Sequence, residues 1–211
     1  MVKRKTAPRL LRGRKRKRRR THAPARARTA GIPRRITPES RVVKLTYHDV
    51  KVYNGGSGTY AVNDYKLGSI FDPDQTGIGH QPLGHDQYAM FYNKYMVLSA
   101  KLTAYFASAR SNSAGSINDP YQYVCGVHCD RVVFDQAPLT TVLERNNSTW
   151  GFLLSATSGK PYLKRAKAVS IKKLMNVKDM MDNEDDYGAA FGSNPATTPM
   201  GTVWVHRSEE R

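Results

Sequence analysis

The sequence predicts an all-β body that follows a disordered basic arm. Segments in which apolar and polar residues alternate recur through residues 39–211, and clusters of Gly, Ser, Asn and Pro separate them. Strands and helices do not alternate, and no long amphipathic helix occurs, which favours an antiparallel β sandwich over an α/β fold. By contrast, residues 1–38 contain 16 Lys or Arg and no acidic residue. We therefore expect an arm (1–38) and one β-sandwich domain (39–211).

The arm carries almost all of the formal net charge of +17. The body holds the other 18 of the 34 basic residues and all 17 acidic residues, so it is nearly neutral. A like-charged block repels itself and buries no apolar surface, so the arm is expected to be disordered until a polyanion binds it. Its cations are expected to bind DNA phosphates without base specificity. The expected DNA-binding residues are Arg12, Arg14, Lys15, Arg16, Lys17, Arg18, Arg19, Arg20, Arg26, Arg28, Arg34 and Arg35.

Two basic clusters in the arm also resemble a two-part nuclear localisation signal. Its residues are Lys3, Arg4, Lys5, Arg14, Lys15, Arg16, Lys17, Arg18, Arg19 and Arg20. The arm lacks the apolar run of a secretory signal, and a transit peptide is less favoured because the arm has few Ser and no regular apolar face. No stretch approaches the length of a membrane-spanning apolar segment, so no membrane association is expected.

The first half of the body is expected to contain one long strand, a loop and a turn. Residues 39–54 alternate with a change of face at His48–Asp49, which predicts a strand with a bulge. Residues 54–85 predict a loop with a short strand near 60–62. The stretch GHQPLGHDQYAMFYNKY (79–95) predicts a turn with positive φ at Gly79 and Gly84 and a short helix capped by Asp86. Its aromatic residues are expected on one helix face: Tyr88, Phe91, Tyr92 and Tyr95.

The clearest strand is 96–106, where every even-numbered residue is apolar. Further strands are predicted at 121–129, 149–154, 162–175 and 202–206, with a short helix at 139–143 that has Pro138 at its first position. The expected surface loops are 54–85, 107–120 and 176–201.

Cys125, His128 and Cys129 resemble metal ligands, but their spacing argues against that role. On one strand, the two cysteines share a face and lie roughly 13 Å apart. That distance is too long for a disulfide or a shared tetrahedral ion, and His128 points to the other face. Two buried structural thiols are therefore expected, and no metal site.

Two other clusters also have simpler explanations. His80, His85 and Asp86 have no accompanying nucleophile or phosphate-binding motif, so a turn with a helix cap explains them better than catalysis. The acidic run lacks the order of a calcium-binding loop, so it predicts a solvated loop or a partner for basic residues of a neighbouring subunit. Its members are Asp179, Asp182, Glu184, Asp185 and Asp186.

A second basic group lies between residues 160 and 173. Either it extends the polyanion-binding surface or it is an ordinary exposed strand, and both interpretations remain open. Its members are Lys160, Lys164, Arg165, Lys167, Lys172 and Lys173, and all except Lys160 are additional candidates to face DNA.

At GHQPLGHDQYAMFYNKYMVLSAKLTAYF (79–106) the chain resembles capsid proteins of circovirus-like viruses, which have circular, Rep-encoding single-stranded DNA genomes. Proteins of that group often carry G-H-Q-P-L/M-G-x-D-Q/E-aromatic, then F-Y-N-x-Y and a strand. The Arg-rich N-terminus matches as well. So do LKRAKAVSIKKLMNVKD (163–179), S-N-P (193–195) and GTVWVH (201–206), so the resemblance covers most of the chain and is most specific at 79–95.

The resemblance implies a single viral jelly roll, in which two four-stranded antiparallel sheets pack face to face. About sixty copies would close a T=1 icosahedral shell, with the arms facing inward onto circular single-stranded DNA. It also implies a virion protein that enters the host nucleus through an import receptor and uses an attachment receptor of unknown identity. The 79–95 stretch would then be a structural joint that positions the strand after it.

One departure concerns the end of the chain. In that group another strand usually follows the GTVWVH-like strand, whereas here the sequence stops at HRSEER. Either the sequence is shortened or a neighbouring subunit is expected to complete the sheet edge.

Two other function classes are less favoured. A cellular nucleic-acid-binding protein, such as a ribosomal protein with a basic extension, is the alternative, but ribosomal proteins usually spread cations over the body as well. An enzyme is not expected, because no set of nucleophile, base and oxyanion donor is evident. No catalytic residue and no cofactor is predicted.

Overall fold

The computed structural model describes residues 38–53, 58–107, 123–153 and 162–207. The chain divides into two units, Met1–Pro38 and Glu39–Arg211. All the arm residues predicted to bind DNA or to form the localisation signal lie outside the described residues, as does Lys160. Those predictions therefore stay predictions, and the account below concerns the second unit.

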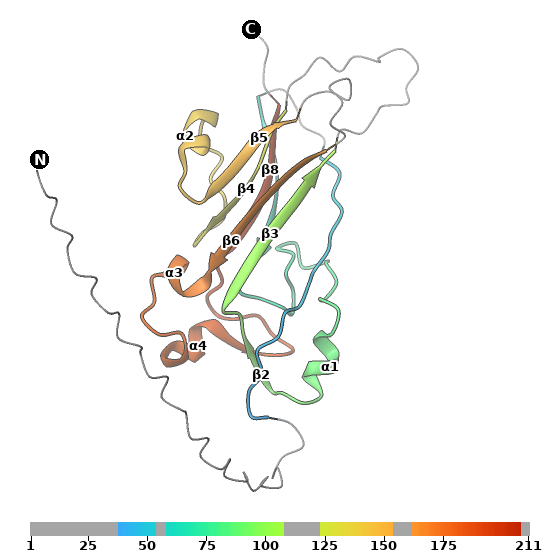
Figure 1. Ribbon diagram of the computed structural model, residues 1–211, viewed down its shortest axis with the longest axis vertical. Helices are drawn as coiled ribbons and strands as arrows, with labels where there is room; N and C mark the ends of the chain where they lie inside the picture. The colour runs from blue at the N-terminus through green and yellow to red at the C-terminus, as the bar shows by residue number, and fades with distance from the viewer. Residues whose placement is uncertain (1–37, 54–57, 108–122, 154–161, 208–211) are drawn as a thin grey trace, which may run out of the picture. The chain divides into compact units, whose positions relative to one another are not determined.

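The described part of the second unit is mostly β (Figure 1). Each strand pairing in it is antiparallel, which confirms the predicted all-β class. The strands are β1 (Tyr60–Lys66), β2 (Lys94–Met96), β3 (Ser99–Phe106), β4 (Tyr123–Asp130), β5 (Ser148–Leu153), β6 (Leu163–Ser170), β7 (Gly188–Ala190) and β8 (Met200–Arg207). The helices are short: α1 (His85–Ala89), α2 (Leu139–Glu144), α3 (Ile171–Met175), the 3₁₀ helix η2 (Met181–Asn183) and α4 (Glu184–Tyr187).

The strands form one four-stranded sheet in the order β1-β8-β4-β5, together with the pairs β3–β6 and β2–β7. In Figure 1 the β3–β6 pair lies in front of the four-stranded sheet. The last strand of the described residues, β8, is central, because it pairs with both β1 and β4. The resemblance implies two four-stranded sheets, whereas the described residues form only one.

The central strands of the four-stranded sheet, β4 and β8, are buried on both faces. Toward β3–β6, a core cluster joins Cys125, Val127, Val203, Val205 and Phe106, with Leu153 of β5. On the opposite face, Val124 and Trp204 pack against Phe134 and Val142, so α2 and the chain before it cover that side. Because β4 and β8 have apolar neighbours on both faces, they are the best-buried strands of the described body.

Residues 38–53 form neither helix nor strand, so the predicted strand with a bulge at His48–Asp49 is wrong. Val50 and Val52, which the alternation places on a second packed face, are 91% and 83% exposed. The half-buried residues are odd-numbered both before and after His48–Asp49, so the segment does not change face there. They are Leu45, Tyr47, Lys51 and Tyr53.

Polar contacts explain which side of this segment faces the body. Lys51 Nζ lies 2.8 Å from Asp74 Oδ2 and 3.2 Å from Asp49 Oδ2. The Tyr65 hydroxyl donates to Asp49 at 3.2 Å. Asp74 is buried, so a partner for its charge is worth more than the burial of one more valine. The valine spacing alone could not reveal this competition.

The other element predictions were mostly confirmed, with shifted bounds, although Pro138 is the N-cap before α2 and not its first helical residue. The strand expected at 96–106 is split, because β2 ends at Met96 and β3 begins at Ser99. The strand expected at 162–175 ends at Ser170, where α3 begins. Asn176 has φ 56° and its N–H donates to carbonyls in α3, so a left-handed cap stabilises a helix there. The short strand expected near 60–62 is β1, which extends to Lys66, whereas the loop expected at 176–201 contains η2, α4 and β7.

The 79–95 stretch is a turn followed by α1, as expected, but its details differ. Gly84 has φ 96° directly before the helix, which confirms the predicted positive φ. Gly79 does not have positive φ; instead, a Cβ there would lie 2.8 Å from Asp74 Cβ and from the Tyr47 hydroxyl. Asp86 is not the cap, because it lies inside α1 and its carboxylate pairs with His85 Nδ1 at 3.0 Å.

The aromatic residues of that stretch do not share one helix face. Phe91 is 61% exposed and follows the end of α1 at Ala89, so it does not belong to a packed face of that helix. Tyr95 lies in β2, where its hydroxyl donates to the Ser193 carbonyl at 2.9 Å and its ring packs 5.6 Å from Phe191. The joint is therefore held by Tyr95 and its contacts with the segment after β7.

Gly84→Ala is expected to lower the free energy of unfolding by about 1–2 kcal/mol, because an L-residue is strained in the left-handed region. A suitable control is Gly192→Ala, where a Cβ meets nothing within 4 Å and φ is not positive. Urea unfolding of both variants tests this difference. Equal midpoints for the two would contradict a special conformational need at Gly84.

Candidate functional site

The second basic group is divided between two faces of the β3–β6 pair. Cross-strand partners in a sheet share a face. Arg165 is opposite Ala104 and Lys167 is opposite Leu102, so both basic residues share the face that packs on the core. Lys164 is opposite Tyr105 on the other face. The group is therefore not one continuous basic surface.

Arg165 and Lys167 make internal contacts. Arg165 Nε donates to the Trp150 carbonyl at 2.7 Å, and its guanidinium lies over Gly151, where a Cβ would overlap it. Lys167 Nζ donates to the Asn146 carbonyl at 3.2 Å. These contacts fasten β6 to β5 and to the chain just before it, which is a structural role for both side chains.

The other face of the pair, here called the outer face of β3–β6, combines cations with exposed aromatic rings. Tyr105 is 61% and Tyr162 55% exposed, and their ring centroids are 5.9 Å apart. Lys164 Nζ lies 5.0 Å from the Tyr105 ring centroid, and a hydrogen bond with Tyr105 raises the pKa of this lysine. Lys101 is also exposed. Alternation along 99–105 already places Lys101 and Tyr105 together, so this cluster was readable from the sequence but was missed.

Lys172 and Lys173 lie on α3, just after β6, and both are exposed. Together with Lys164, they are the described members of the second basic group that remain candidates to face DNA.

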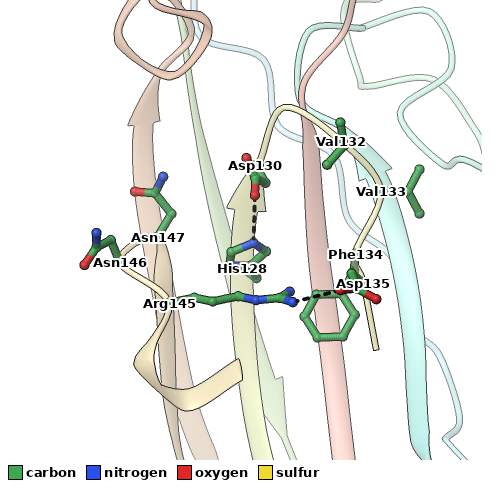
Figure 2. Close-up of a pocket in the computed structure, with 9 residues that line it drawn as sticks. All are labelled: His128, Asp130, Val132, Val133, Phe134, Asp135, Arg145, Asn146 and Asn147. Atoms are coloured by element: carbon green, nitrogen blue, oxygen red, sulfur yellow. Dashed lines mark hydrogen bonds and ion pairs between the residues drawn. The ribbon is translucent and has the colours of Figure 1, made fainter. Parts of the chain in front are cut away.

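A pocket of about 330 Å³ lies beside the end of β4 (Figure 2). The residues that line it are His128, Asp130, Val132, Val133, Phe134, Asp135, Arg145, Asn146 and Asn147. The Arg145 guanidinium lies 5.3 Å from the Phe134 ring centroid and 3.5 Å from Asp135 Oδ2. The sequence carried no periodic signal for this pocket, since its residues come from separate segments between 128 and 147.

His128 is buried and has a partner at each ring nitrogen. Nδ1 lies 3.2 Å from Ser148 Oγ, and Nε2 lies 3.5 Å from Asp130 Oδ2. These three residue types can form a nucleophilic relay in hydrolases. Ser148, however, is not among the residues that line the pocket, so its hydroxyl is not presented to a molecule bound there. The arrangement supports a structural role for His128, and the lack of enzymatic activity stays a prediction.

The stability of the body is expected to fall as the pH drops below about 6.5. Burial lowers the pKa of His128, with Arg145 and Lys167 adding to the effect and Asp130 opposing it. The unfolded chain therefore takes up a proton at a pH where the folded protein does not, which favours unfolding until the pH reaches the folded-state pKa. Melting temperatures measured between about pH 7.5 and pH 5 quantify this loss.

His128→Gln should make that melting curve flatter than the wild-type curve. The control is His80→Gln, because His80 is exposed and stacks on Tyr47 at 4.6 Å without being buried. An equally steep curve for the His128 variant would show that other groups cause the pH dependence.

The two cysteines are buried and unpaired, as predicted. Burial raises the pKa of Cys125 to about 12 and that of Cys129 to about 11, so both thiols stay protonated near neutral pH. Both belong to core clusters. In the part of the chain that the structure describes, no group of His, Cys, Asp and Glu could hold a metal ion. No helix in that part is long and apolar enough to span a membrane.

The remaining predicted clusters have contacts within the body. His85 is buried, and besides Asp86 it contacts the Phe191 carbonyl at 3.0 Å through Nε2. In the acidic run, Glu184 pairs with Lys94 at 3.0 Å, and Asp179 Oδ1 accepts from the Met181 N–H. The acidic run is therefore not a plain loop, because its members help to build η2 and α4 and to connect α4 with β2.

Comparison with protein-family models gives no match. Comparison with curated protein sequences gives no match either. Among solved structures, the body is similar to a chain from Desmodium yellow mottle tymovirus, with a TM-score of 0.34 and 7% sequence identity over 81% of this chain and 83% of that one.

Proposed function

We propose that this chain is the coat protein of a circovirus-like virus, and that it self-assembles into a closed shell around single-stranded DNA. The observation that carries the proposal is the separation of charge along the chain. Residues 1–38 hold 16 cations and no acid, and the following 173 residues are nearly neutral. A neutral body can approach copies of itself closely, while the arms neutralise a packaged polyanion.

Two further features support the proposal. The described body is an antiparallel β structure with a four-stranded sheet, an architecture compatible with a single jelly roll. The stretch at 79–95 resembles the capsid proteins of that virus group, and it folds as a joint before β3 in which buried His85 contacts Asp86 and the Phe191 carbonyl. The proposed assembly is a T=1 shell of about sixty copies. The proposed locations are the virion and, during assembly, the host nucleus.

Negative-stain electron microscopy of the full-length protein, with the ratio of absorbance at 260 and 280 nm, tests this function. Uniform shells that retain nucleic acid are the expected result. Folded monomers over a wide range of salt would contradict assembly. Nucleic acid without shells, together with sedimentation alongside ribosomes, would instead favour a cellular nucleic-acid-binding protein.

A further inference from the structure

We infer that the outer face of β3–β6 is a second contact surface for single-stranded nucleic acid, on which bases stack against Tyr105 and Tyr162. In this inference Lys101 and Lys164 contact the phosphates on either side of the stacked bases. The inference rests on the proposed function and adds to it a body surface and a mode of contact. The arm has no comparable rings, because residues 1–38 contain no Phe, Tyr or Trp.

The geometry of the two rings suits stacking. Both tyrosines are more than half exposed, and their rings are 5.9 Å apart and tilted by 55°, so they do not cover one another face to face. Every base has a π face, so exposed aromatic rings beside cations bind single strands with little sequence preference. Lys164 is exposed, and its Nζ lies 5.0 Å from the Tyr105 ring centroid, so it is close to a base that stacks on that ring.

The charges around this surface are strongly segregated. The sequence between Asp86 and Asp119 contains three basic residues and no acid, and the sequence between Glu144 and Asp179 contains eight basic residues and no acid. These two stretches include β3 and β6, which pair with one another. They hold most of the body's 18 cations and none of its 17 acids. On the outer face itself the described cations of the two strands are Lys101 and Lys164, and neither β3 nor β6 contains an acidic residue that would offset them.

The exposed rings favour nucleic acid over other polyanions. A sulfated glycan would satisfy the lysines, but it has no flat π system to cover the tyrosines. A second copy of the chain would need acidic groups opposite Lys101 and Lys164, together with an apolar cover for the rings. Along β3 and β6 the alternating outer residues are small or polar apart from the tyrosines, so this face lacks the apolar centre typical of a subunit interface.

The test compares two probes of equal length and charge on the full-length protein: an oligothymidylate and an abasic oligonucleotide. Nucleic acid that copurifies is first removed in high salt. The arm lacks Phe, Tyr and Trp and is expected to bind through phosphates, so it should bind the two probes with nearly equal affinity. Stacking adds affinity for the oligothymidylate alone, by about tenfold. The double variant Tyr105→Leu/Tyr162→Leu should abolish the difference and leave binding of the abasic probe unchanged.

Phe91→Leu is the matched control, because Phe91 is exposed to the same 61% as Tyr105 but lies outside β3 and β6. The melting temperature of each variant is measured to check that it folds. Photo-crosslinking with 5-iododeoxyuridine in the oligothymidylate, followed by peptide mass spectrometry, should label Tyr105 or Tyr162.

The outcomes separate this inference from the proposed function. Equal wild-type affinity for the two probes would overturn the stacking surface and leave DNA binding by the arm intact. A preference that survives in the double tyrosine variant would place the stacking elsewhere and also overturn it. If neither probe binds, the proposed function itself fails.

Discussion

Deletion of residues 1–38 is expected to remove most of the nucleic acid that the protein retains and to leave the body folded. The deleted segment carries 16 of the 34 cations and no acid. On single strands, the logarithm of the binding constant falls with the logarithm of salt concentration by about 0.7 for each phosphate neutralised. If about half of the arm cations engage phosphates, the full-length protein has a slope of roughly −6. The deletion variant should retain only the small slope due to the body.

Titration of an oligothymidylate at several salt concentrations gives both slopes. The matched control is a full-length variant in which the residues of the arm are permuted without changing its composition. Because the contacts are with phosphates, the permuted arm should bind as the natural arm does. A deletion variant that binds with the full-length slope would show that the arm is not the DNA-binding element.

Trp204→Ala is expected to lower the free energy of unfolding by about 3–5 kcal/mol, the usual cost of truncating a buried aromatic residue. Trp204 is fully buried in β8, stacked 6.3 Å from Phe134 and with its ring centroid 6.0 Å from that of Tyr60. Its ring also covers Gly126, where a Cβ would lie 2.5 Å from Trp204 Cζ2. The truncation would leave a cavity between β8 and the cover that α2 and the chain before it form over this face of the sheet.

The other tryptophan provides the control for this prediction. Trp150 in β5 is 36% exposed, and its Nε1 donates to the Leu143 carbonyl at 3.0 Å. Trp150→Ala should therefore cost much less, about 1–2 kcal/mol. Denaturant unfolding followed by circular dichroism measures both. Similar losses for the two variants would show that the core under α2 is less important than its burial indicates.

Alternation predicted the strands well where one face is covered by a continuous core. In β3, the inward residues Leu102, Ala104 and Phe106 all have even numbers, as the pattern requires. The same rule failed for 38–53, because the orientation there is decided by the buried charge of Asp74, a residue from another part of the chain. It also failed at Ile171, which continues the strand pattern but begins α3. Tertiary contacts overrode local pattern in both places.

The candidate sites show a similar division. The sequence analysis treated Lys164, Arg165 and Lys167 as one group because of their charge. Their spacing on a strand already implied that Lys164 lies on the opposite face from Arg165 and Lys167. The tyrosines of the outer face could have been found by assigning faces first and counting charges second. The His128 pocket could not, because its walls meet only when β4, the segment after it and the chain beyond α2 are folded together.

The central position of β8 has a consequence for how the protein is made. Residues 60–66 of β1 pair with residues 200–206, so the first and last described strands must meet before the four-stranded sheet exists. Pairings between such distant segments are slow to form, because a long loop must close before any contact is gained. During synthesis β1, β4 and β5 leave the ribosome without the strand that joins β1 to β4. The body therefore cannot complete its sheet before residue 207 has been translated, while the basic arm is exposed to nucleic acid from the earliest stage of translation.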